Sequence, residues 1–320
     1  MAKMMDAKTK FANIELALNT AKIAHAEIQF PITHNPLLGN AFTDSNGVQF
    51  GFTQIGIGYF YNHLKQFDVK YATLTAMVRN GLFSNIPDFL NPMLGNRKFI
   101  ASFFMGNIVG ANIKYNEIPH KDIISDIQTA GLADLLYSYE INEQAMKLYI
   151  ADKAILTDEQ GNDILDTFTG MVVINGHSGH KALSFRSYFT RGKYKYISEQ
   201  ISSGKARHLS NAIPVYQKMA ETFNIVREFA LTERLKTISI QRVFAQVIDK
   251  MELSTRQEAI VMDVENEVSL KNALDVVMYL SDQLELMKKS GIEAICDAIC
   301  TYAFNLGGYQ LKDGKFVSFP

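Results

Sequence analysis

The sequence lacks the features that mark an exported or membrane-spanning protein. It has two cysteines, Cys296 and Cys300, no tryptophan and seven prolines in 320 residues. The cysteines lie four residues apart within a helical pattern, which favours two reduced thiols on one helix face over a disulfide framework. The first 28 residues carry charges throughout, and no stretch approaches the ~20 apolar residues of a membrane span. We therefore expect a cytoplasmic protein with no membrane partner.

The sequence also lacks an excess of charge of one sign. It has 32 Lys and Arg against 33 Asp and Glu, a formal net charge of -1. No global field marks a histone-like or polyanionic protein, so any nucleic-acid site must be local. The strings GxxxxGK[ST], GxGxxG, HExxH and GxSxG are all missing, which removes the common phosphate-loop, dinucleotide, zinc-protease and serine-hydrolase motifs. Catalysis is therefore neither indicated nor excluded, and no cofactor is expected.

With 47% hydrophobic residues, the chain can bury a sizeable core. The patterns predict an α+β fold with an N-terminal helix, an antiparallel β-meander core and a helical C-terminal third. We divide the chain into an α+β core domain at residues 1–207, a helical region at 208–307 and a terminal hairpin or tail at 308–320.

The front of the chain is unusually aromatic. Residues 6–27 fit an amphipathic first helix loosely. Residues 28–64 contain one charged residue, Asp44, among seven Phe and Tyr. We interpret this stretch as core strands and tight turns, with Asn46-Gly47 as a hairpin turn; a subunit interface or a ligand pocket is the alternative.

The next segments predict strands and one helix. Residues 97–115 indicate two strands around Gly106-Asn107, and Pro119 opens a helix that reaches about Tyr137. Apolar and polar residues then alternate in a meander, with strands near residues 146–156, 164–174 and 183–196.

Helical spacing replaces this alternation after Lys205. It begins with Ile213, Tyr216, Met219, Phe223, Val226 and Phe229. Further helices are expected near residues 240–251, 269–289 and 292–304, and Asp313-Gly314 predicts a terminal hairpin.

The most informative local feature is a basic, aromatic segment from Phe185 to His208. It holds six basic residues against one acid, a local charge of +5. Nine residues form the candidate nucleic-acid site: Arg186, Tyr188, Arg191, Lys193, Tyr194, Lys195, Tyr196, Lys205 and Arg207. With a turn at Arg191-Gly192, one strand presents Arg186, Tyr188 and Thr190 on one face. On the other strand, Lys193 and Lys195 lie opposite to Tyr194 and Tyr196.

Such a surface suits single-stranded nucleic acid. Cations neutralise phosphates and release counterions, while aromatic rings stack on bases at about 1–3 kcal/mol each without reading sequence. The alternative is a solvated strand whose charges keep a sheet edge soluble.

A second candidate site is the loop from Asn175 to His180. His177 and His180 flank small residues between two strands, and a metal could use both. Because metal sites need three or four ligands, remote residues such as Asp163, Asp166 or His208 would have to complete it. A glycine-rich turn is the alternative. The other histidines, including His25, His34, His63 and His120, show no spacing that argues for catalysis.

The order of segments resembles a phage- and plasmid-borne family known as domain of unknown function 932. Three stretches carry the likeness: Ile55 to Phe60, Arg97 to Asp122 and Gly170 to Phe189. Together with the helical continuation, the resemblance covers roughly residues 50–235. The chain departs from the family pattern at Gly176, where the family's loop usually has Ser after the Asn. It departs again at Gly192 to Lys195, where members often carry a Cys-x-Asn-Gly element, so it resembles a divergent member.

The resemblance implies a mobile-element context near replication and recombination functions, and no established reaction. Beside the basic segment, this context favours single-stranded DNA as partner and a homo-oligomer that binds or anneals it. A metal-dependent enzyme centred on His177 and His180 is the second hypothesis. A structural or host-interaction protein that self-associates through residues 28–64 is the third.

Overall fold

The computed structural model describes residues 7–68, 70–112, 118–151, 167–178, 183–191, 194–200, 214–233, 309–312 and 315–318. The fold is α+β, as expected from the sequence. The chain forms two compact units. Unit 1 comprises Met1–Ile124, Tyr139–Lys147 and Ile174–Leu183. Unit 2 comprises Ser125–Ser138, Leu148–Val173 and Ser184–Pro320.

Unit 1 contains a six-stranded sheet in the order β1-β5-β6-β4-β3-β2. Its strands are β1 (Ala24–Gln29), β2 (Thr33–Asn35), β3 (Ala41–Thr43), β4 (Gln49–Phe52), β5 (Lys98–Phe104) and β6 (Asn107–Asn112). β4 and β6 are parallel, and the other neighbours are antiparallel. The hairpins predicted at Asn46-Gly47 and Gly106-Asn107 are confirmed as β3–β4 and β5–β6. Gly47 and Gly106 have φ angles of 85° and 79°, which favour glycine.

The first helix is shorter than the sequence indicates. α1 spans Ala7–Ala21, and β1 begins at Ala24. The expected continuation to residue 27 is wrong, because Lys22 adopts a left-handed φ of 47° and ends the helix.

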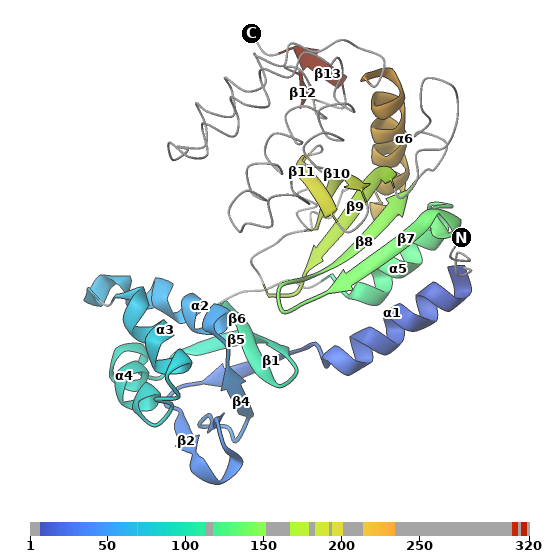
Figure 1. Cartoon of the computed structure of the whole chain (residues 1–320). Helices are drawn as coiled ribbons and strands as arrows, with labels where there is room; N and C mark the ends of the chain where they lie inside the picture. Colours follow the sequence, from blue (N-terminus) through green and yellow to red (C-terminus); the bar gives the residue numbers. More distant parts are fainter. Residues whose placement is uncertain are drawn as a thin grey trace. The chain divides into compact units, whose positions relative to one another are not determined.

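Three helices and two 3₁₀ turns complete the described part of unit 1 between β2 and β5. They are η1 (Pro36–Leu38), α2 (Gln54–Leu64), η2 (Lys65–Phe67), α3 (Tyr71–Arg79) and α4 (Asn85–Leu94). Figure 1 shows α2, α3 and α4 grouped beside β5 and β6. The expectation of strands and turns throughout residues 28–64 is therefore wrong over α2.

α2 begins at a side-chain cap and lies directly on β6. The Thr53 hydroxyl accepts a hydrogen bond from Gly56 N at 3.0 Å and donates one to Ile108 O at 3.1 Å. A Cβ atom on Gly56 would lie 1.9 Å from Ile108 O. Only glycine therefore allows the helix to approach the strand this closely.

The expected burial of the aromatic stretch is confirmed. Phe60 of α2 is fully buried, and its ring makes edge-on contacts with three other phenylalanines. The ring centroids lie 5.2 Å from Phe99, 5.5 Å from Phe30 and 5.7 Å from Phe52. Such T-shaped pairs add to the free energy gained by burial. The aromatic side chains thus form the core that joins α2 to the sheet.

The second sheet is a meander in the order β11-β10-β9-β8-β7. Its strands are β7 (Leu136–Ile141), β8 (Ala145–Ala151), β9 (Thr167–Gly176), β10 (Ser184–Arg191) and β11 (Tyr194–Gln200). α5 (His120–Thr129) and η3 (Ala133–Leu135) precede it. The helix predicted to reach Tyr137 ends at Thr129, because Gly131 adopts a left-handed φ of 72° just beyond it.

The helical spacing after residue 205 is confirmed over α6 (Val215–Glu233), which packs against β10. Met219, Phe223 and Val226 are buried at that spacing. The terminal hairpin is confirmed as β12 (Tyr309–Lys312) paired with β13 (Lys315–Ser318).

Several predictions fall on the rest of the chain. The helices expected near residues 240–251, 269–289 and 292–304, and the domain boundaries after residues 207 and 307, lie outside the described residues. Within the part that is described, no helix is long and apolar enough to cross a membrane.

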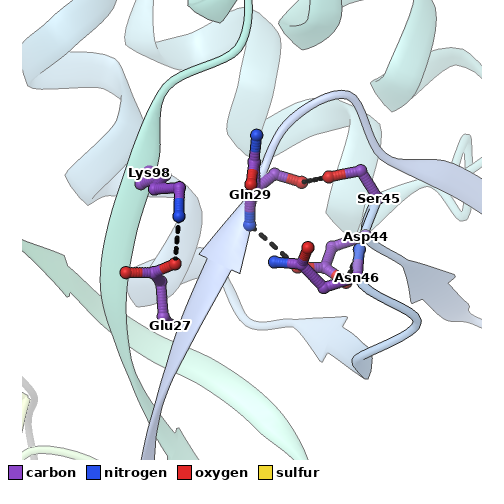
Figure 2. Close-up of polar contacts among 6 residues, drawn as sticks. All are labelled: Glu27, Gln29, Asp44, Ser45, Asn46 and Lys98. Atoms are coloured by element: carbon purple, nitrogen blue, oxygen red, sulfur yellow. Dashed lines mark hydrogen bonds and ion pairs between the residues drawn. The ribbon is translucent and has the colours of Figure 1, made fainter.

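A buried carboxylate organises the turn between β3 and β4. Asp44 is 5% exposed, and its Oδ2 accepts a hydrogen bond from Gln29 N at 2.8 Å. Its Oδ1 accepts hydrogen bonds from Asn46 N at 2.9 Å and Val48 N at 2.8 Å. Figure 2 shows this turn beside β1, where the Ser45 hydroxyl also donates to Gln29 O. The one charge in the aromatic stretch therefore satisfies three backbone donors.

We predict that Asp44→Ala lowers the free energy of unfolding by about 2–4 kcal/mol, because three backbone N–H groups lose their acceptor. Asp44→Asn keeps one acceptor oxygen and should lose less. The matched control is Lys98→Ala, which removes an ion pair with Glu27 whose side chains are 57% and 53% exposed (Figure 2). That change should cost less than about 1 kcal/mol. Urea denaturation measures all three, and equal losses in Asp44→Ala and Lys98→Ala would contradict the prediction.

Candidate functional site

The basic segment forms a β-hairpin at the end of the meander. β10 and β11 are antiparallel, with one irregularity between Arg186 and Tyr188. Three pairs of residues face each other near the turn: Phe189 with Tyr196, Thr190 with Lys195, and Arg191 with Tyr194. Among the strands that the structure describes, β11 is the outermost of its sheet. The backbone thus brings the predicted cations and tyrosines together at one end of the hairpin.

Tyr188 does not have the role that the sequence suggested. Its side chain is 1% exposed, and its ring makes an edge-on contact with Tyr149 at 5.1 Å. Burial, followed by the neighbouring Tyr137 and Tyr149, raises the pKa of Tyr188 well above its ordinary value. The prediction that Tyr188 stacks on bases is therefore wrong in this structure, where the ring belongs to the core of unit 2.

The other predicted residues are placed to different extents. Arg186 is half-buried, and within the described residues its Nε atom has no hydrogen-bond partner. Arg191, Tyr194, Lys195 and Tyr196 are placed by their backbone pairing alone. Lys193, Lys205 and Arg207 lie outside the described residues.

A chain of side-chain hydrogen bonds in unit 1 lies at the end of β9. The Asn175 amide nitrogen, Nδ2, donates to Ile118 O and to His120 Nδ1, each at 2.9 Å. Because a backbone carbonyl can only accept, Ile118 fixes the orientation of the Asn175 amide. His120 Nδ1 must therefore be an acceptor without a proton.

This assignment fixes the next link. Neutral His120 carries its proton on Nε2, which donates to His177 Nδ1 at 3.1 Å. His177 then carries its own proton on Nε2, an atom that is buried and has no hydrogen-bond partner among the described residues. The two imidazoles meet edge-on at 5.3 Å, and Phe104 stacks on His177 at 5.9 Å. We call Asn175, His120 and His177 the histidine relay.

Backbone contacts hold the relay in place. His25 Nε2 of β1 donates to His177 O at 3.0 Å. Gln144 O accepts hydrogen bonds from His177 N at 3.1 Å and from the Ser178 hydroxyl at 3.3 Å. A Cβ atom on Gly110 would lie 2.0 Å from Ser178 O, so residue 178 lies directly on β6.

The surroundings keep both imidazoles of the relay neutral. Burial, followed by the nearby His177 and His25, lowers the pKa of His120 to about 3. Burial lowers the pKa of His177 to about 4; the backbone of Glu143 and Asn142 opposes this shift, and His25 adds to it. At neutral pH the relay therefore carries no charge.

The relay is poorly suited to metal coordination. A metal bound at His120 Nε2 would require the proton on Nδ1, where it would face the donor amide of Asn175. Of the other expected ligands, His180, Asp163, Asp166 and His208 lie outside the described residues. Among the residues that are described, no group of three or more His, Cys, Asp and Glu could hold a metal ion.

Sequence reasoning missed the relay. It identified His177 but regarded His25 and His120 as scattered, because His120 lies 95 residues after His25 and 57 residues before His177. A polar Asn175 at the end of an apolar strand was the one local signal, because a buried amide requires partners.

Three comparisons with known proteins found no relative of this chain. No protein-family model, curated protein or solved structure matches the chain. The resemblance to domain of unknown function 932 therefore stays a hypothesis.

The close contact at Gly110 gives a paired prediction. Gly110→Ala should lower the free energy of unfolding by about 2–3 kcal/mol, since the new methyl group overlaps Ser178 O and the backbone must move. Ser102 pairs with Gly110 in the sheet, and its buried hydroxyl has no hydrogen-bond partner within the described residues. Ser102→Ala should leave stability unchanged or raise it by up to about 1 kcal/mol. Thermal and urea unfolding distinguish the two, and equal destabilisation would show that β6 is not closely packed at this point.

Proposed function

We propose that this chain is a nucleic-acid-handling protein that binds single-stranded DNA, without sequence preference, through the β10–β11 hairpin. The register of that hairpin is the observation that carries the proposal. It pairs Arg191 with Tyr194 and Thr190 with Lys195, on β10 and on β11, which is the outermost strand of the sheet within the described residues. A cation and an aromatic residue at adjacent positions are what a base and its phosphate require.

The charge of the segment supports an electrostatic mode of binding. Six basic residues and one acid occur between residues 185 and 208, in a chain whose net charge is -1. Arg191 is the last residue of β10 and Lys195 is the second residue of β11, and Lys193 lies between them in sequence. Phosphate contacts by these side chains would release counterions, so affinity should fall steeply as salt rises.

Tyr194 and Tyr196 are the tyrosines that we propose stack on bases. Tyr188 is excluded because its ring is buried against Tyr149. Its role is to hold β10 to the core of unit 2, which gives the hairpin a rigid base.

The biological setting is part of the proposal. The resemblance to a phage- and plasmid-borne family supports a role in replication or recombination, in the cytoplasm of a host cell. Annealing or protecting single strands is cooperative along the strand in many such proteins, so we infer that the chain acts as a homo-oligomer.

Fluorescence anisotropy tests the proposal. The full chain is titrated onto labelled oligonucleotides of two unrelated sequences at several salt concentrations. We expect similar affinities for both sequences and a linear fall of log affinity with log salt. Arg191→Ala and Lys193→Ala should each weaken binding equally for both sequences and reduce the salt slope by about one.

Two matched variants serve as controls. Tyr188→Phe keeps the buried ring, and Lys98→Ala removes an exposed cation from unit 1; neither should change binding. Melting temperatures are measured in parallel, because a large fall in Arg191→Ala would show that this residue maintains the fold. Absence of binding at low salt would overturn the proposed function.

A further inference from the structure

The histidine relay connects segments that lie far apart in sequence. His120 is the first residue of α5, Asn175 lies at the end of β9, and His177 follows that strand directly. The bonds run in one direction, from Asn175 to His120 and from His120 to His177. The position of each proton depends on the one before it, and Ile118 O fixes the first.

The relay has no position for an additional proton. A proton on His120 Nδ1 would face the Asn175 amide donor. A proton on His177 Nδ1 would face His120 Nε2–H, and His120 cannot turn that proton away without protonating Nδ1. Either addition places two donors against each other in a buried site, where an unpaired polar group is costly.

The surrounding groups act on the relay in opposite senses. His25 of β1 disfavours further positive charge on both rings. The backbone of Asn142 and Glu143, in the turn between β7 and β8, lies close enough to His177 to favour a proton on its ring. Phe104 of β5 covers the His177 ring and contributes no charge.

We propose that the histidine relay is a proton-operated latch, which holds the end of β9 to the start of α5 and releases it on acidification. Opening takes up two protons from solvent, one on each imidazole. It breaks the hydrogen bonds from Asn175 to His120 and from His120 to His177. The relay then no longer holds His177 in place, so the hydrogen bonds from His177 N and the Ser178 hydroxyl to Gln144 O become weaker. This latch is separate from the proposed DNA binding.

The pH window follows from the two imidazoles. In the closed latch, the pKa values of His120 and His177 are lowered from 6.5 to about 3 and about 4. The open form therefore binds protons below pH 6.5 that the closed form excludes. The latch is fully stable above pH 6.5, and its stability is lost as the pH falls from 6.5 towards 4. Well below pH 6.5 opening becomes about tenfold more favourable per pH unit for each histidine, or about a hundredfold for both; between pH 6 and 5 the combined factor is about sixty.

Nitrogen NMR of the imidazoles tests the closed state in the unmodified chain. We expect His120 and His177 both as the Nε2–H tautomer at pH 7, and both still neutral in the folded protein at pH 5.5. Observation of an Nδ1–H tautomer, or of a cationic ring at pH 5.5, would overturn the latch. This measurement needs no variant and decides the matter even if substitutions prevent folding.

Amide hydrogen exchange tests opening. After correction for intrinsic rates, the opening constant at His177 N should rise about sixtyfold between pH 6 and 5. His177→Asn keeps an acceptor for His120 Nε2–H but does not titrate, so the rise at the same amide should fall to about eightfold. His34→Gln, outside the relay, should leave the larger rise unchanged. The same pH dependence in His177→Asn and in the unmodified chain would overturn the proposal.

Discussion

The described part of unit 1 depends on how closely two backbone segments approach β6. α2 approaches at Gly56, where any side chain would overlap Ile108 O, and residue 178 approaches at Gly110. Because backbone atoms cannot yield as side chains can, these two contacts set the position of α2 and of the end of β9. Strand β6 therefore positions both the aromatic core around Phe60 and the histidine relay.

Turns and regular spacing are what the sequence predicted well. The hairpins at Asn46-Gly47 and Gly106-Asn107 use positive φ angles that glycine adopts freely, and so they are encoded locally. The terminal hairpin, β12 paired with β13, also joins strands that are close in sequence. The spacing of buried residues in α6 is equally local. These elements need no knowledge of distant residues, which is why composition and periodicity sufficed for the α+β class.

The errors arose where long-range contacts decide. The glycine and aromatic residues of α2 favour a strand in the sequence. The segment is a helix because the Thr53 side chain caps its first turn and also donates to Ile108 O of β6. Tyr188 alternates with cations as a surface tyrosine would, yet both it and Phe185 are buried. The relay joins His120 to Asn175 and His177 through the fold alone, and His25 donates to the backbone carbonyl of His177. Of the candidate hairpin site, the sequence supplied the residues and the structure supplied their pairing.

Leu37, at the tip of η1, is 93% exposed. The turn beneath it is held by other groups: Asn35 Oδ1 accepts from Leu37 N at 3.2 Å, and Gly39 N donates to Pro36 O at 3.3 Å. Folding therefore places no demand on the side chain at position 37. Substitutions at such a position do not affect folding. An apolar residue conserved there across divergent relatives would therefore indicate that this position contacts a binding partner.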